Sequence, residues 1–337
     1  MKRLCFVLPL LLTIFYGCEK HCSTNSEQTK LSAIEEMQKF NDSLAMVNHS
    51  RGIGWTCFKK SCLIAGADFA GFGAGVAATK EIALLAAIPT GGTGGVAVAS
   101  FCGLICAIGA SSEAFDHCYP PTRSVHDIYT PTMIAKAHIY NQNYQEAAKT
   151  RNSGGTDTDY SDDDEDGGTE TEIAYTHLSE LVNIPEEYEY VRDFGLYHND
   201  CLATLEDVEQ GLVSLDDVEL NEDLQTIIQS EEYQQSYDNI ILATVSATTI
   251  DGLNIDQYVA VDGIYLTGKA VRVYELFLDV YNSYTDEDAD IIELINRYIN
   301  IIENSDEFTS DEKEAIYASF MIAADSPQYW QPYINEE

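Results

Sequence analysis

Positive charge is scarce in this chain of 337 residues. The whole chain has 18 lysine and arginine residues against 56 aspartate and glutamate residues, and residues 151–337 hold 6 of the former and 45 of the latter. So acidic a surface repels phosphate backbones and anionic membranes, which excludes nucleic-acid binding as a function class. It attracts basic proteins, cationic peptides and divalent cations. We therefore expect an unknown protein or other cationic partner, and no nucleic acid.

The sequence also lacks the short motifs of common enzyme classes. It has no Gly-x-Ser-x-Gly and no His-Glu-x-x-His, and the glycine run at 91–95 is not followed by the lysine of a phosphate loop. The seven histidines are scattered, and carboxylates are too common for any one pair to indicate acid–base chemistry. We expect no enzymatic activity, no catalytic residues and no cofactor.

The N-terminal segment, residues 1–17, predicts an export signal. Lys2 and Arg3 precede an apolar run at 4–16 that is too short to span a bilayer. A glycine before Cys18 resembles the lipobox of bacterial lipoproteins, although the two bulky residues before that glycine depart from the usual pattern. The resemblance implies cleavage before Cys18, acylation of Cys18 and attachment to the bacterial cell envelope, at the outer membrane or cell surface. The alternative is an ordinary secretory signal.

Small residues recur every four positions in the Gly/Ala-rich segment at 63–115. A proline followed by glycines near its middle predicts a turn between two antiparallel helices. Small residues at this spacing allow two helix backbones to approach closely. The helix-packing positions that we single out are Gly71, Gly75, Gly95, Ala99 and Gly103.

In composition and spacing, this segment resembles glycine-zipper peptides and Gly/Ala-rich helical bacteriocins. The resemblance implies insertion into a bilayer, or self-association at one. The alternative is a hairpin packed against protein. The ionisable residues Asp68, Lys80 and Glu81 favour this alternative, because each would make a membrane-spanning helix costly. In that case Asp68 should be a solvated or capping side chain.

The cysteines bracket the same segment. Disulfides are expected outside the cytoplasm, and an antiparallel hairpin would place Cys62 near Cys118. We therefore expect a disulfide between these two residues. A zinc site that adds Cys57 and either His117 or His126 is a less favoured alternative, because the spacings match no standard zinc pattern.

Residues 151–172 are rich in charge and poor in apolar side chains, which is typical of a disordered linker. Within them, Asp162, Asp164 and Asp166 match the beginning of an EF-hand calcium loop. Position 173 is isoleucine, where the loop requires an acidic residue. The three aspartates are therefore only a weak calcium candidate, and divalent-cation buffering by the acidic half is a third hypothesis.

The acidic remainder, residues 173–337, predicts a bundle of amphipathic helices. Apolar residues recur at helical spacing in 268–284 and 285–304. A capping box begins a last helix at 309, which should stop before Pro327. The stretch 221–250 predicts one long helix, and 256–266 is ambiguous between helix and extended chain.

These patterns together predict an all-α protein in which a Gly/Ala-rich helical hairpin is followed by an acidic helical bundle, joined by a disordered acidic linker. We expect a non-catalytic, lipid-anchored envelope protein that binds a partner, or alternatively a membrane-active, bacteriocin-like or toxin-like protein that uses residues 52–119. The expected segments are a signal at 1–17, a tether and short helix at 18–50, the hairpin at 51–119, a connecting helix at 120–150, the linker at 151–172 and the helical domain at 173–337.

Overall fold

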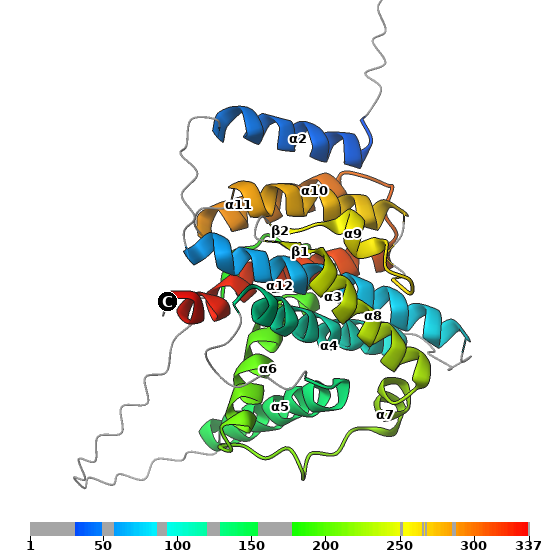
Figure 1. Ribbon diagram of the computed structural model, residues 1–337, viewed down its shortest axis with the longest axis vertical. Coiled ribbons are helices and arrows are strands. Elements are labelled where there is room, and N and C mark those ends of the chain that lie inside the picture. The colour runs from blue at the N-terminus through cyan, green and yellow to red at the C-terminus, as the bar shows by residue number, and fades with distance from the viewer. Residues whose placement is uncertain are drawn as a thin grey trace, which may run out of the picture. The chain divides into compact units, whose positions relative to one another are not determined.

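The computed structural model describes the chain over residues 31–48, 57–85, 93–119, 129–153, 177–249, 252–264, 266, 268–284 and 288–335. Within these residues the chain is all-α apart from one pair of two-residue strands (Figure 1). The strands pair antiparallel, with Thr248 opposite Leu253. The elements in chain order are α2 (Ala33–Asn48), α3 (Cys57–Leu85), α4 (Thr93–Cys118), α5 (Pro131–Ser153), the 3-10 helices η1 (Leu178–Leu181) and η2 (Glu186–Val191), α6 (Phe194–Glu209), α7 (Glu222–Ile228), α8 (Glu231–Ala247), β1 (Thr248–Thr249), β2 (Gly252–Leu253), α9 (Ile255–Val259), α10 (Gly268–Tyr284), α11 (Asp288–Glu303) and α12 (Ser310–Asn335).

The Gly/Ala-rich segment forms two antiparallel helices, α3 and α4. A Cβ atom built on Gly71 would lie 2.8 Å from the Cβ of Ala110, and one built on Gly75 would lie 3.0 Å from the Cα of Gly103. Later residues of α3 therefore contact earlier residues of α4, so the two helices run antiparallel. The absence of side chains at these positions is what allows the two backbones to pack this closely.

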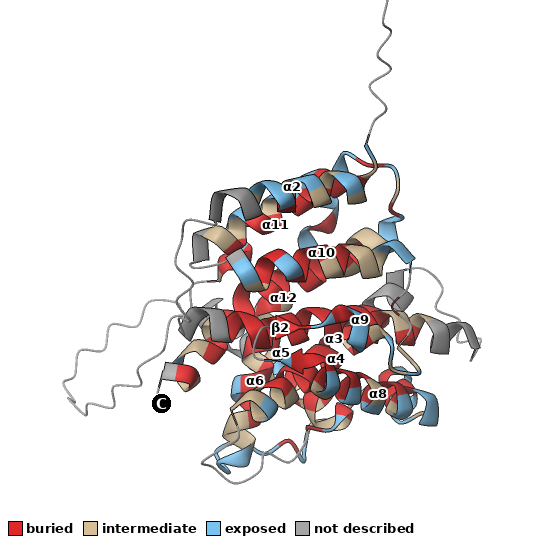
Figure 2. Cartoon of the chain, turned by 45° about the horizontal axis from the view of Figure 1, so that its top comes forward, coloured by how far each residue is buried: buried red, intermediate tan, exposed pale blue. Residues whose placement is uncertain are grey.

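Other helices enclose this hairpin, which we define as α3 and α4. Helices α12, α8 and α10 pack on α3, and α8, α5 and α6 pack on α4. From 61 to 80, every residue of α3 is buried except Ala77 and Lys80 (Figure 2). The acidic helices thus bury their apolar faces on the hairpin, which forms the inner layer of the described fold.

The amphipathic helices α10 and α11 lie where the apolar spacing predicts them. On α11 the side chains of Ile291, Ile295 and Tyr298 are fully buried, while the intervening polar residues face outward. The predicted capping box is also present at the beginning of α12. The Thr309 backbone N–H donates to Glu312 Oε2 at 2.8 Å, and the Glu312 N–H donates to Thr309 Oγ1 at 3.2 Å.

The predicted end of α12 before Pro327 is wrong, because the helix continues through Pro327 and Pro332 to Asn335. Proline has no N–H, so Pro327 leaves the carbonyl of Ala323 without its helical donor. The hydroxyl of Tyr281 on α10 donates to that carbonyl at 2.6 Å. A side chain from another helix thus supplies the hydrogen bond that the proline removes.

Two other predicted elements differ in the structure. The stretch 221–250 is two helices, α7 and α8, because the Ser230 hydroxyl accepts the Tyr233 N–H at 3.2 Å and caps a new helix. The ambiguous stretch after it begins with the short helix α9, which Asn254 caps through the N–H of Gln257 at 3.0 Å.

Candidate functional site

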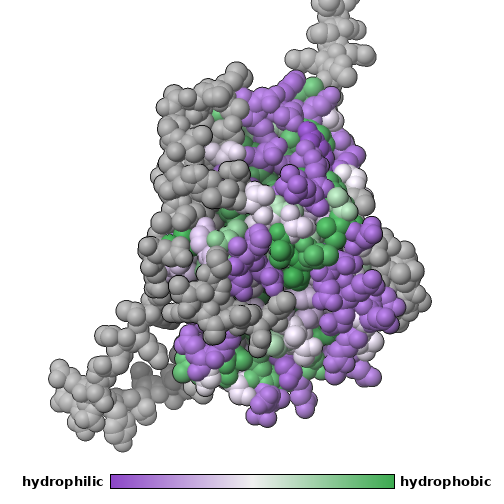
Figure 3. Space-filling view, in the orientation of Figure 1, coloured by the Kyte–Doolittle hydropathy of each residue, from purple (hydrophilic) through white to green (hydrophobic). Residues whose placement is uncertain are grey.

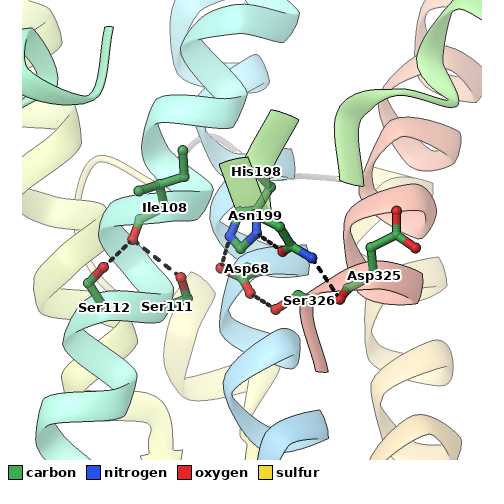
Figure 4. A network of polar contacts seen from close by, with 8 residues as sticks. All are labelled: Asp68, Ile108, Ser111, Ser112, His198, Asn199, Asp325 and Ser326. Carbon is green, nitrogen blue, oxygen red and sulfur yellow. Dashed lines mark hydrogen bonds and ion pairs between the residues drawn. The ribbon is translucent and has the colours of Figure 1, made fainter. Parts of the chain in front are cut away.

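A buried polar network joins α3 to α6 and α12 (Figure 4). His198 Nε2 lies 2.8 Å from Asp68 Oδ1, and the Ser326 hydroxyl donates to Asp68 Oδ2. On the other side of the ring, His198 Nδ1 lies 3.0 Å from Asn199 Oδ1. Asn199 in turn donates from Nδ2 to the backbone carbonyl of Asp325 at 3.0 Å. The network therefore spans three helices that are distant in sequence.

The protonation of His198 follows from this geometry. Both ring nitrogens face side-chain oxygens, and a ring that carries a proton on each nitrogen, the imidazolium, can donate to both. Burial alone would lower the pKa of His198, but the charge of Asp68 and the bonds to Asp68 and Asn199 outweigh burial and raise it above its usual value. Asp68 and His198 thus form an ion pair with no exposed side-chain surface.

Asp325 extends the network from α12 to η1. Its carboxylate accepts the Ser179 N–H at 2.9 Å and the Ser179 hydroxyl at 2.7 Å. His177 Nδ1 lies 4.0 Å from Asp325 Oδ2. Burial raises the pKa of Asp325, and the bonds from Ser179 oppose part of that rise. Gly195 on α6 leaves room for this carboxylate, because a Cβ atom at that position would collide with Asp325.

The arrangement cannot perform nucleophilic catalysis. The Ser326 hydroxyl donates a hydrogen bond to Asp68, a carboxylate that is itself paired with His198, and both nitrogens of His198 are occupied. The side chains of Asp68, His198, Asp325 and Ser326 are also closed to solvent. What the network can do is hold α3 against α6 and α12, since removing one partner of a buried ion pair costs about 3–5 kcal/mol.

Asp68 is a correction to the sequence analysis, which expected a solvated or capping side chain. Its burial became possible only because His198, 130 residues away in sequence, supplies a compensating charge. Sequence reasoning missed His198, Asn199 and Asp325 altogether. The available signal was weak: a single carboxylate within an otherwise apolar Gly/Ala run, and an Asp-Ser pair within the apolar face of the last helix.

The predicted helix-packing residues lie on the hairpin. Gly71, Gly75 and Gly103 are at the contact of α3 with α4, where a Cβ on Gly75 would lie 2.7 Å from the Cβ of Cys106. Ala99 is buried on α4. Gly95 lies within α4, but its surroundings are outside the description of the structure.

The predicted disulfide between Cys62 and Cys118 is not present between these two described residues. Cys62 is buried near the beginning of α3, and Cys118 is half-buried at the end of α4. Across the described part of the chain, no group of three or more His, Cys, Asp or Glu side chains could hold a metal ion.

Several predicted features lie outside the described residues. They are the signal at 1–17, the lipidation candidate Cys18, the calcium candidates Asp162, Asp164 and Asp166, and most of the linker at 151–172. Helix α5 extends three residues into that linker, to Ser153.

A shallow groove of about 510 Å³ lies between the η1 segment and α11. Carboxamides of Asn183, Asn296 and Asn300 line it. Two of its three charged residues are already engaged: Arg192 donates to the carbonyl of Val182 at 3.0 Å, and Glu303 accepts from Lys313 at 2.9 Å. The groove therefore offers amide groups, apolar side chains and the exposed carboxylate of Glu180.

Comparisons of this chain with protein-family models, with curated proteins and with solved structures gave no match.

Proposed function

We propose that this protein is a lipid-anchored protein of the bacterial cell envelope, held outside the cytoplasm, whose helical unit binds a cationic partner without catalysis. The support for the anchor is the lipobox-like sequence at Cys18. The support for a non-catalytic role is the sealed Asp68 network described above. The observation that carries the binding proposal is a series of exposed carboxylates along one part of the chain.

This surface lies in a part of the chain that has no lysine or arginine at all, residues 193–268. It runs from the loop after α6 through α7 to the beginning of α8, and we call it the acidic edge. Hydrophilic residues cover much of the described surface on the face drawn in Figure 3. The exposed residues that define the acidic edge are Asp216, Asp217, Glu219, Glu222, Asp223, Glu231 and Glu232.

The chemistry of the acidic edge suits a basic protein or a peptide rich in lysine and arginine. Closely spaced carboxylates on one surface accelerate the approach of a cationic partner and align it. Leu212, which precedes the edge in the same loop, is 70% exposed and offers an apolar contact beside the charges. A partner that combines cationic and apolar side chains would therefore match both features.

Isothermal titration of the full chain with an octalysine peptide tests this proposal. The Asp216→Asn/Asp217→Asn variant should bind the peptide about three- to tenfold more weakly, since an exposed ion pair contributes up to about 1 kcal/mol. The control is Glu186→Gln/Glu187→Gln, which removes two exposed charges from η2. An equal loss in both variants would mean that only net charge attracts the peptide, and the acidic edge would be rejected as the binding site.

A further inference from the structure

The two helices of the hairpin have the length and composition of membrane-crossing helices. Ser61–Lys80, of 20 residues, and Val98–Cys118, of 21 residues, are each long and apolar enough to cross a membrane. A spanning helix needs about 20 apolar residues. Protein covers 94% of the apolar window in the first stretch and 72% of the window in the second, so an apolar environment already surrounds most of both.

The hairpin is also held together by its own contacts. Its two helices meet through Gly71, Gly75 and Gly103, and none of these contacts involves a surrounding helix. Small residues are the type of contact that keeps helices paired in lipid, where no hydrophobic effect drives their association. The pair could therefore leave the bundle without losing the packing between α3 and α4.

Four of the surrounding helices, α6, α8, α10 and α12, form what we call the sheath. Sheath side chains cover the hairpin with aromatic rings, and the Tyr233 hydroxyl donates to the carbonyl of Cys102 at 3.1 Å. The sheath gives the hairpin an apolar environment. A lipid bilayer would give it an apolar environment too.

The ionisable residues of the hairpin are placed unevenly. On α4, the ionisable residues lie near the C-terminal end of the apolar stretch; they are Glu113, Asp116 and His117. On α3, Lys80 is the last residue of the apolar stretch and pairs with Asp311 at 3.5 Å. Asp68 is the exception, because it lies well inside its stretch. It is also the residue that the sheath holds, through His198 on α6 and Ser326 on α12.

We propose that the hairpin is a stored membrane-inserting element, that the contact of Asp68 with His198 and Ser326 is the latch that retains it in the sheath, and that its target is a zwitterionic lipid bilayer. The lipid class follows from a net charge of −38, which repels anionic surfaces. This proposal does not depend on the acidic edge or on its partner.

Thiol labelling of the full chain tests the proposal. The chain carries Cys18→Ala, so that a lipid attached at Cys18 cannot bring the protein to the vesicles. Cys102 and Cys106 are buried reporters on the hairpin. Ser319→Cys adds a buried reporter on the sheath, at a serine that contacts Tyr274. The protein is mixed with phosphatidylcholine vesicles and a water-soluble maleimide, and each thiol is quantified by mass spectrometry.

Insertion should raise the labelling of the Ser319→Cys thiol by at least about tenfold on addition of vesicles, while Cys102 and Cys106 stay protected by lipid. Labelling of all three thiols would indicate general unfolding and would overturn the proposal. Unchanged labelling of all three would overturn it as well. Phosphatidylglycerol vesicles should give less labelling than phosphatidylcholine, and more labelling would contradict the choice of lipid class.

The latch is tested by Asp68→Asn, which keeps the shape of the side chain and removes its charge. Vesicles should expose the sheath thiol at least about tenfold faster in this variant than in the parent. The control is Tyr298→Phe, which removes a buried hydrogen bond of 2.9 Å to Asn41, between α11 and α2 and away from the hairpin. Equal acceleration by the two variants would reject the latch, and the labelling of the parent chain still tests insertion if Asp68→Asn fails to fold.

Discussion

His198 Nε2 lies 2.8 Å from Asp68 Oδ1, and neither side chain has any exposed surface. This contact joins the Gly/Ala-rich half of the sequence to the acidic half at the centre of the fold. A charge pair so completely enclosed contributes little to stability as a pair, but it makes each partner depend on the other. The chain therefore cannot lose either residue without leaving a buried charge.

The first prediction concerns that dependence. Asp68→Asn or His198→Gln alone should lower the free energy of unfolding by about 3–5 kcal/mol, because each leaves one buried charge without its partner. The double variant should lose less than the sum of the two, since it leaves neither charge behind. Urea unfolding of the four proteins measures the coupling, and strictly additive losses would contradict the ion pair.

The second prediction is a pH dependence. Burial opposes the protonation of His198, but Asp68 and Asn199 outweigh it and raise the pKa, so the folded protein holds this proton more tightly than the unfolded chain. The resulting stability is fully present below about pH 6.5, the usual histidine pKa, and is lost as the pH rises through the higher folded pKa. The raised pKa of Asp325 acts in the same direction, because burial disfavours its charged form.

Chemical unfolding between pH 5 and pH 9 checks this dependence, with His198→Gln as the comparison. The variant should lose less stability than the parent over this range, because it no longer has the histidine proton to lose. Parallel curves for the two proteins would show that surface charge alone sets the pH dependence.

The third prediction concerns the proline in α12. Tyr281→Phe should lower the free energy of unfolding by about 1–3 kcal/mol, because it leaves the carbonyl of Ala323 buried without its donor. Tyr274→Phe is the matched control, since its hydroxyl partner Ser319 retains a 2.9 Å bond to the carbonyl of Ala315. Thermal unfolding should rank the two variants in this order, and an equal loss would contradict the role of Tyr281.

The fourth prediction separates two glycines of the same helix. Gly75→Ala should destabilise the protein by about 1–3 kcal/mol, because the new Cβ would lie 2.7 Å from the Cβ of Cys106 and force the hairpin apart. Gly66→Ala should be neutral or stabilising by up to about 1 kcal/mol, because its nearest neighbour, 3.2 Å away, is the movable end of Leu278 and alanine favours helix. Urea unfolding compares the two, and an equal effect would mean that close packing is not the cause.

The fifth prediction tests the lipid anchor in cells. Cys18→Ala should move the protein from the membrane fraction to the soluble fraction, because a chain that is not acylated loses its attachment. Cys22→Ala, four residues later, should leave the protein in the membrane fraction. Retention of the Cys18→Ala protein would reject lipid at Cys18 as the sole attachment and would mean that another part of the chain, such as the hairpin, holds the protein in the membrane.

Local patterns predicted much of the helical architecture. The apolar spacing of residues 268–284 and the Thr309 capping box both depend on residues a few positions apart, and both are present in the structure. The errors occurred where distant groups change a local preference. The predicted stop at Pro327 is wrong because Tyr281, 46 residues earlier, donates to the carbonyl that proline leaves unpaired.

The candidate site depends even more on contacts between residues that are distant in the sequence. The network joins Asp68 to residues 130 and 258 positions away, and no spacing rule connects such positions. An aspartate within an apolar run is compatible with a solvated cap or with a buried ion pair. The choice depends on whether a cation reaches it.

The sequence by itself determined the charge division, the small-residue spacing of the hairpin and the faces of the amphipathic helices, because these depend on composition and on the period of an α-helix. Only the tertiary structure decided that the acidic helices enclose the hairpin and that Asp68 meets His198. The physical reason is that a buried charge is stable only beside its counter-charge, and the fold, rather than the order of residues, brings the two together.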